Sequence, residues 1–192
     1  MRPGTPPGSA VNMKIDLHTH TFEATGKWLD EDVVREIVDK AKEKGLNGIG
    51  ITEHEFKSYG LQFKEIADRC CGGDMLVIPG QEISVWPVEM VELYLPGDRV
   101  FRFICHPGFP PTDFSRMADR VQGIEINNAL HGWQMDQERI RAVAKEYDLL
   151  LLSNSDAHSL DDIGQHYNEL SLDDLLARSE PYVPRRQGEQ RL

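Results

Sequence analysis

The chain has 192 residues, about the length of one domain, and a domain of this size buries about 70% of its unfolded surface around a single core. A net charge of -11 disfavours general binding to nucleic-acid phosphates, although a small anionic substrate stays compatible if some carboxylates hold cations. Apolar runs stay short of the about 20 residues that a membrane span needs, and no signal segment opens the chain. We therefore expect a soluble, cytoplasmic protein with no membrane partner, and the oligomeric state is not indicated.

The two ends of the chain differ in composition from its body. Residues 1–12 are rich in Pro, Gly, Ser and Thr, and residues 181–192 are polar and basic without helical or strand periodicity. We expect a disordered lead at 1–12, one globular domain at 13–180 and a flexible tail at 181–192.

Strand-like and helix-like segments alternate through the body, which favours an α/β fold with a mostly parallel sheet. After a first strand at 14–21, a helix is expected from about Leu29 to Gly45. Its apolar face consists of Val33, Val34, Ile37, Val38 and Ala41. Further strands are expected at 48–54, 75–83, 90–95, 100–105, 123–127 and 149–154, and further helices around 63–70, 114–121 and 140–147. About seven strands result.

The three cysteines do not form a recognisable metal-binding or disulfide pattern. Cys70 and Cys71 are adjacent, and Cys105 stands alone on an apolar strand, so none has the spacing of zinc ligands. We expect all three to be reduced core residues.

Six of the seven histidines lie where predicted strands give way to loops. Two of them belong to the segment Asp16-Leu17-His18-Thr19-His20, and because alternate residues of a strand share a face, His18 and His20 can bind one ion. A similar segment, Ser155-Asp156-Ala157-His158, follows an apolar run near the other end of the chain. Both ends are expected to supply one site, because the carboxyl ends of barrel strands meet at one edge. The seventh histidine, His166, is expected at the surface.

In this order and spacing, six short blocks resemble the PHP (polymerase and histidinol phosphatase) family of metal-dependent phosphoesterases. Each block alone is weakly specific, but six in order are not expected by chance. They are Asp16-Leu17-His18-Thr19-His20-Thr21, Ile51-Thr52-Glu53-His54, Pro79-Gly80-Gln81-Glu82-Ile83-Ser84, His106-Pro107-Gly108, Glu125-Ile126-Asn127-Asn128 and Ser155-Asp156-Ala157-His158.

The resemblance implies a distorted (β/α)7 barrel in a single domain, with two or three divalent metal ions. A shared carboxylate is implied between the first two ions, where its charge offsets their repulsion. The set is rich in imidazole, which suits zinc, manganese or iron better than calcium or magnesium. The implied ligands are His18, His20, Glu82 and Asp156 for the first ion, Glu82, His106 and His131 for the second, and His54 and His158 for the third.

Two departures from the family pattern bear on the third ion. Many members carry Asp or His five or six residues after the second histidine, where this chain has Thr25 and Gly26. Glu23, or Glu53 in the block that usually reads Thr-Asp-His, could supply the missing ligand. Asp16 is expected to orient a ligand histidine rather than to bind metal directly.

The leading functional expectation is a phosphoesterase that hydrolyses a phosphate ester of a small metabolite or nucleotide through a metal-activated hydroxide. Proton transfer is assigned to Asp156, His158 or His131. A phosphate-binding arginine is expected among Arg99, Arg102, Arg116 and Arg139, with none favoured.

Two alternatives stay open at this point. The first is an amidohydrolase-like reaction on a C–N or C–O bond, because a metal-activated hydroxide also attacks carbonyl groups. The second is a non-catalytic, regulatory metal-binding domain, which the missing ligand near Thr25 suggests.

Overall fold

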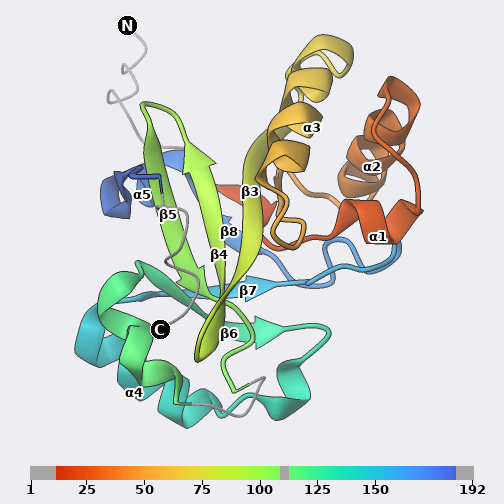
Figure 1. Ribbon diagram of the computed structural model, residues 1–192. Coiled ribbons are helices and arrows are strands. Elements are labelled where there is room, and N and C mark those ends of the chain that lie inside the picture. Colours follow the sequence, from red (N-terminus) through yellow and green to blue (C-terminus); the bar gives the residue numbers. More distant parts are fainter. Residues whose placement is uncertain (1–11, 109–112, 185–192) are drawn as a thin grey trace, which may run out of the picture.

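The computed structural model describes residues 12–108 and 113–184, and within these ranges nine strands form one sheet (Figure 1). The sheet order is β7-β6-β5-β4-β3-β2-β1-β8, and β9 pairs with β5. The strands are β1 (Met13–Asp16), β2 (Gly48–Ile51), β3 (Leu76–Val85), β4 (Val88–Leu95), β5 (Arg99–Ile104), β6 (Gly123–Asn128), β7 (Leu150–Asn154), β8 (Asn168–Leu170) and β9 (Glu180–Pro181). The helices are α1 (Thr21–Thr25), α2 (Glu31–Glu43), α3 (Lys57–Cys70), α4 (Gln137–Tyr147) and α5 (Leu172–Arg178), with 3-10 turns η1 (Phe114–Arg120) and η2 (Gly132–Gln134).

The sheet nearly closes on itself because the segments that follow β1 and β7 pair with each other. Thr19 and Ala157 form a parallel bridge, and the His20 N–H donates to the Ala157 carbonyl at 2.9 Å. The Asp156 N–H donates to the His18 carbonyl at 2.9 Å. The protein is thus a mixed α/β domain with a nearly closed, barrel-like sheet, in which the beginning and the end of the body meet.

The expectation of a mostly parallel sheet is only partly correct. β1, β2 and β3 pair in parallel, as do β5, β6 and β7, but β4 is antiparallel to both β3 and β5. Only Trp86 and Pro87 connect β3 to β4, and only residues 96–98 connect β4 to β5, whereas a parallel pair needs a crossover of about a dozen residues or more. The regular (β/α)7 pattern is therefore not confirmed.

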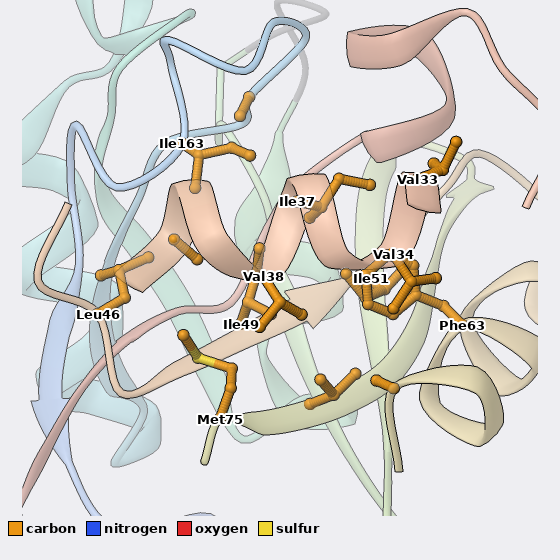
Figure 2. Packing of buried hydrophobic residues seen from close by; sticks show 14 of the residues in the cluster. Val33, Val34, Ile37, Val38, Leu46, Ile49, Ile51, Phe63, Met75 and Ile163 are labelled. Atoms are coloured by element: carbon orange, nitrogen blue, oxygen red, sulfur yellow. The ribbon is translucent and has the colours of Figure 1, made fainter. Parts of the chain in front are cut away.

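The largest part of the core lies between the sheet and the helices α2 and α3 (Figure 2). The five apolar positions predicted for one face of α2 are all buried there, and Ile49 and Ile51 of β2 face them. The helix begins after Asp30, whose side chain accepts a hydrogen bond from the Val33 N–H at 2.8 Å. This packing holds the carboxyl end of β2 against β3.

A close approach of α3 to the sheet makes Gly60 sensitive to substitution. A methyl carbon at Gly60 would lie 2.8 Å from the carbonyl oxygens of Ile51 and Gly80. These backbone atoms cannot move away without disturbing the sheet. Gly60→Ala is therefore expected to lower the free energy of unfolding by about 1–3 kcal/mol, although alanine is the better helix former. Urea denaturation measures this, with Gly132→Ala as the control, since a methyl carbon there meets nothing within 4 Å. Equal stability of the two variants would contradict the prediction.

The ends of the chain lie mostly outside the described residues. The expected lead at 1–12 overlaps them only at Asn12, and the expected tail overlaps them at 181–184. Pro181 pairs with Arg99, and the Tyr182 N–H donates to the Asp98 carbonyl at 2.7 Å, so the packed body extends slightly past residue 180. Within 12–108 and 113–184, no helix is long and apolar enough to cross a membrane, and the cytoplasmic location stays a prediction.

Candidate metal centre

Four buried donor atoms from three distant parts of the chain meet beyond the end of β1. The His18 Nε2 lies 3.1 Å from the His20 Nε2, 3.3 Å from the Glu82 Oε2 and 3.4 Å from the Asp156 Oδ1. The His20 Nε2 lies 3.2 Å from both oxygens. Ligand atoms about 2.1 Å from a tetrahedral zinc ion are about 3.4 Å apart, so these separations fit a single ion. The structure thus brings together the four residues expected at the first ion.

Local chain geometry explains how these side chains converge. His18 and His20 alternate with Leu17, which packs in the core, and with Thr19, whose hydroxyl donates to the Gly50 carbonyl at 2.7 Å. Asp156 follows β7 with a left-handed backbone, φ 55°. Its N–H remains bonded to the His18 carbonyl, so the turn delivers the carboxylate to the histidine pair.

Glu125 orients the His18 ring. Its Oε1 lies 3.0 Å from the His18 Nδ1 and accepts a hydrogen bond from the Asn154 amide at 2.8 Å. Its Oε2 accepts hydrogen bonds from the His106 N–H at 2.7 Å and the Asn128 amide at 2.9 Å. A proton held at Nδ1 by this carboxylate leaves a lone pair at Nε2, facing the other donors. The sequence pattern includes Glu125 in a family block, but sequence reasoning assigned it no role and gave this kind of role to Asp16.

Asp16 in fact contacts the backbone of the histidine segment rather than a ring. Its carboxylate accepts hydrogen bonds from the N–H groups of His18, Ser155 and Gly164 and from the Ser155 hydroxyl. Complete burial raises the pKa of Asp16 to about 6 in spite of these donors. Asp16 therefore contacts the ligand histidine His18 through its backbone N–H rather than through its ring, and its other contacts join the ends of β1 and β7.

A second group of donors surrounds the other oxygen of Glu82. The His106 Nε2 lies 2.9 Å from the Glu82 Oε1 and 4.0 Å from the Asp156 Oδ2, while the His131 Nε2 lies 3.9 Å from that Asp156 oxygen. Donor atoms of His18, Glu82, Cys105 and His106 all lie within 4.8 Å of one another. Glu82 is therefore placed to be shared between two ions, and Cys105 is a neighbour that sequence spacing did not indicate.

A third group contains the histidines expected at the third ion. The His54 Nε2 lies 3.7 Å from the Glu23 Oε1, and the His158 Nε2 lies 3.3 Å from the Glu23 Oε2. His20 completes the group, and its ring stacks on His54 and His158 at centroid distances of 4.2 and 4.4 Å. Glu23 of α1 thus occupies the place of the acidic or histidine ligand that is missing at Thr25 and Gly26.

The other proposed substitute, Glu53, points to the start of α1. Its carboxylate accepts hydrogen bonds from the Phe22 N–H at 2.8 Å and the Thr21 hydroxyl at 3.0 Å. The Thr25 hydroxyl donates to the Thr21 carbonyl within the same helix. Glu53 therefore positions the helix that carries Glu23, and the third group contains Glu23 rather than Glu53.

Glu23→Gln is expected to reduce binding at the third group while leaving the buried donors of the first group intact. The glutamine amide lacks the negative charge with which Glu23 would stabilise a cation between the two imidazoles. Elemental analysis after dialysis should show about one ion fewer per chain than the wild type. Phe22→Leu, a change on the same short helix, serves as the control and should keep the full complement. Equal metal content in all three proteins would contradict a ligand role for Glu23.

The electrostatics of the first two groups favour replacement of protons by a cation. Burial opposes ionisation of Glu82, but the charge of His18 and the surrounding hydrogen bonds outweigh it and hold the pKa of Glu82 well below its usual range. Burial likewise opposes the charged forms of His20 and His106, yet their hydrogen bonds to carboxylates raise the pKa of each. The carboxylates therefore favour positive charge at these imidazoles, and a bound divalent cation would supply that charge in place of protons.

The four arginines considered for phosphate binding have other partners. Arg99 bonds to Ser179, and the Arg102 Nε donates to the Glu92 Oε1 at 2.8 Å. Arg116 and Arg139 both pair with Asp113. Arg139 also lines a cavity of about 410 Å³ with Pro107 and Gln134, each close in sequence to a histidine of the second group. Of the four, Arg139 is the one placed beside that cavity.

Solved structures share this fold at low sequence identity. PsfC from Pseudomonas syringae matches with a TM-score of 0.64 at 16% identity, over 88% of this chain and 90% of its own. A Bifidobacterium adolescentis protein that carries the name of a metal-dependent phosphoesterase matches with a TM-score of 0.62 at 15% identity, over 90% and 97%. An amidohydrolase from Chromobacterium violaceum, with bound sulfate and no metal, matches with a TM-score of 0.59 at 15% identity, over 87% and 97%.

Residues 134–178 match the family model PHP_C, described as PHP-associated. This match supports a PHP family assignment. The matched segment includes α4, β7 and the loop with Asp156 and His158, so it contributes these two residues to the donor groups. Comparison with curated protein sequences gives no match.

Proposed function

We propose that this protein is a metal-dependent phosphoesterase of the PHP type that hydrolyses a phosphate ester of a small metabolite or nucleotide. The observation that carries the proposal is the placement of Glu82 between two donor groups. One of its oxygens faces His18 and His20, and the other faces His106 at 2.9 Å. A carboxylate in this position can hold two cations close enough to act on one phosphate group.

Zinc, manganese or iron ions bound here would supply a water nucleophile that is activated near neutral pH and would neutralise charge on phosphate oxygens. The protein residues around these ions would hold the metal ligands in place and exclude bulk water. His18, Glu82 and Glu125 are all buried, so their relative positions are fixed by packing rather than by solvent. Two structural neighbours with the same fold are named as a phosphoesterase and an amidohydrolase, which supports a hydrolase function for this protein.

Among the three residues assigned to proton transfer, His131 has the most suitable surroundings. Asp156 belongs to the buried donor set, and the His158 Nδ1 lies 2.9 Å from the Asp156 carbonyl oxygen, with its Nε2 directed at Glu23. Partial burial and the nearby charge of His106 lower the pKa of His131, so its ring is neutral at neutral pH and able to accept a proton. We assign His131 to proton transfer and Asp156 and His158 to metal binding.

An amidohydrolase-like reaction is the second candidate, because a structural neighbour with that name matches nearly as well as the one named for phosphoester hydrolysis. That neighbour contains bound sulfate and no metal, which does not separate the two reactions. The motive for a purely regulatory domain is weaker, since Glu23 fills the place of the missing ligand.

Metal analysis and hydrolysis assays on chelator-free protein test the proposal. We expect two or more ions per chain and turnover of p-nitrophenyl phosphate or bis-p-nitrophenyl phosphate, with both lost in His18→Ala and both retained in His166→Ala. Turnover of p-nitrophenyl acetate or a lactam without turnover of either phosphate ester would favour the amidohydrolase reaction. Bound metal with no turnover of any of these compounds would favour a regulatory domain, and an absence of metal would overturn the proposed centre.

A further inference from the structure

The donor group around His106 contains a buried thiol that no family block predicts. Cys105 directly follows β5, and its side chain is 1% exposed. Its Sγ lies 3.1 Å from the Glu82 Oε1, the same oxygen that lies 2.9 Å from the His106 Nε2. Two consecutive side chains therefore reach one carboxylate oxygen.

The backbone at His106 explains this convergence. In a strand, consecutive side chains point to opposite faces, so Cys105 and His106 could not meet at one atom. His106 has a left-handed backbone, φ 30°, and its N–H is held by the Glu125 Oε2 at 2.7 Å. The turn ends the alternation and directs both side chains towards Glu82.

His131, the other expected ligand of the second ion, is placed differently. Its Nε2 lies beside Asp156 at 3.9 Å, its side chain is 22% exposed, and its ring centroid is 5.0 Å from that of His106. Cys105 is completely enclosed and shares with His18, Glu82 and His106 a set of donor atoms that are all within 4.8 Å of one another. Around Glu82, the enclosed donors of this set are therefore the Cys105 sulfur together with His18 and His106, whereas the His131 Nε2 lies beside Asp156.

We propose that Cys105 is a thiolate ligand of the ion held by Glu82 and His106, an inference that rests on the metal centre proposed above. On binding, the S–H bond breaks, a metal–sulfur bond forms and the proton leaves to solvent, so the oxidation state of the sulfur does not change. Thiolate is a soft ligand, and it selects zinc, iron or cobalt over magnesium and manganese. The second ion of this protein is accordingly zinc or iron rather than manganese.

Cobalt(II) and zinc spectroscopy test the thiolate directly and independently of turnover. The chelator-treated protein is titrated with cobalt(II), and binding stoichiometry and the near-ultraviolet thiolate-to-cobalt charge-transfer band are recorded together. X-ray absorption on zinc-loaded protein should show a sulfur neighbour at about 2.3 Å. Both signals are expected in the wild type and in the double variant Cys70→Ser, Cys71→Ser, whose thiols lie at the end of α3, and neither is expected in Cys105→Ser.

Competition between zinc and manganese gives a second readout. Cys105→Ser should lower the affinity for zinc relative to the affinity for manganese. We expect the loss to be at least about 10-fold to 100-fold, which is the effect of changing a residue that only supports a metal ligand. Full cobalt binding by the wild type without the charge-transfer band would overturn the thiolate but leave the metal centre standing. No cobalt binding by the wild type would overturn both. Because these decisive outcomes come from the wild type, poor folding of Cys105→Ser does not weaken the test, and Cys105→Ala offers a second replacement.

Discussion

Glu82→Gln is expected to reduce metal content from two or more ions to fewer than one per chain and to lower hydrolysis by more than about 100-fold. Loss of residues that merely support metal ligands costs about 10-fold to 100-fold in affinity or activity, and Glu82 faces donors of all three groups. Its Oε2 lies 3.1 Å from the His54 Nδ1 as well as near His18 and His20, and its Oε1 faces His106. Elemental analysis and the phosphate-ester assays measure both effects.

Glu89→Gln is the matched control for this change. The Glu89 Oε2 also lies near the His106 Nε2, but at 3.7 Å and on a partly exposed side chain. The control should retain its metal and its activity. Glu82→Gln protein with an unchanged far-ultraviolet circular dichroism spectrum and a full complement of metal would refute the sharing of Glu82 between ions.

Glu125→Gln is expected to weaken metal binding by about 10-fold to 100-fold without removing any ligand, because the His18 ring loses its charged partner. The carboxylate accepts four hydrogen bonds, and an amide must turn its NH2 group towards one of those donors. We expect the free energy of unfolding of the metal-free protein to fall by about 1–3 kcal/mol. Competition with a chromophoric chelator measures the affinity, and urea denaturation measures the stability.

Asp16→Asn separates these two effects. Asp16 is as completely buried as Glu125 and also accepts several hydrogen bonds, but its partners are backbone groups and the Ser155 hydroxyl. This control should lose stability while binding metal with the wild-type affinity. If both variants lost metal affinity equally, the orientation of His18 by Glu125 would not be the cause.

Local periodicity predicts the helices α2, α3 and α4, whereas α5, whose Leu175 is also buried in the core, is not among the expected helices. The face of α2 was read from apolar residues three and four positions apart, and the same residues are buried against β2 and β3. The direction of β4 was missed because an alternating or apolar strand reads the same in either direction. The two-residue connection before Val88 was the available signal for an antiparallel neighbour.

The histidine pair after β1 was predictable because its spacing is local. The role of Glu125 was not, since it depends on contact with His18 across 107 positions of the sequence. Cys105 was missed for a different reason: strand alternation places it on the face opposite to His106, and only the left-handed backbone of His106 reverses this. Glu23 and Glu53 were equivalent as candidates until the folded chain placed one at the histidines and the other at the start of α1.

The closure between β1 and β7 has a consequence for how the protein is made. The Leu17 N–H donates to the Asn154 side chain across 137 positions, and this contact is one of several between the two segments that bring Asp156 to the histidine pair. At about 5–20 residues per second, a ribosome completes Asp156 roughly 7–27 s after His20 has been added. During this interval the nascent chain carries two histidines without the carboxylate that completes their site. We therefore expect metal insertion to follow chain completion, so that the ion enters a barrel whose two ends have already met.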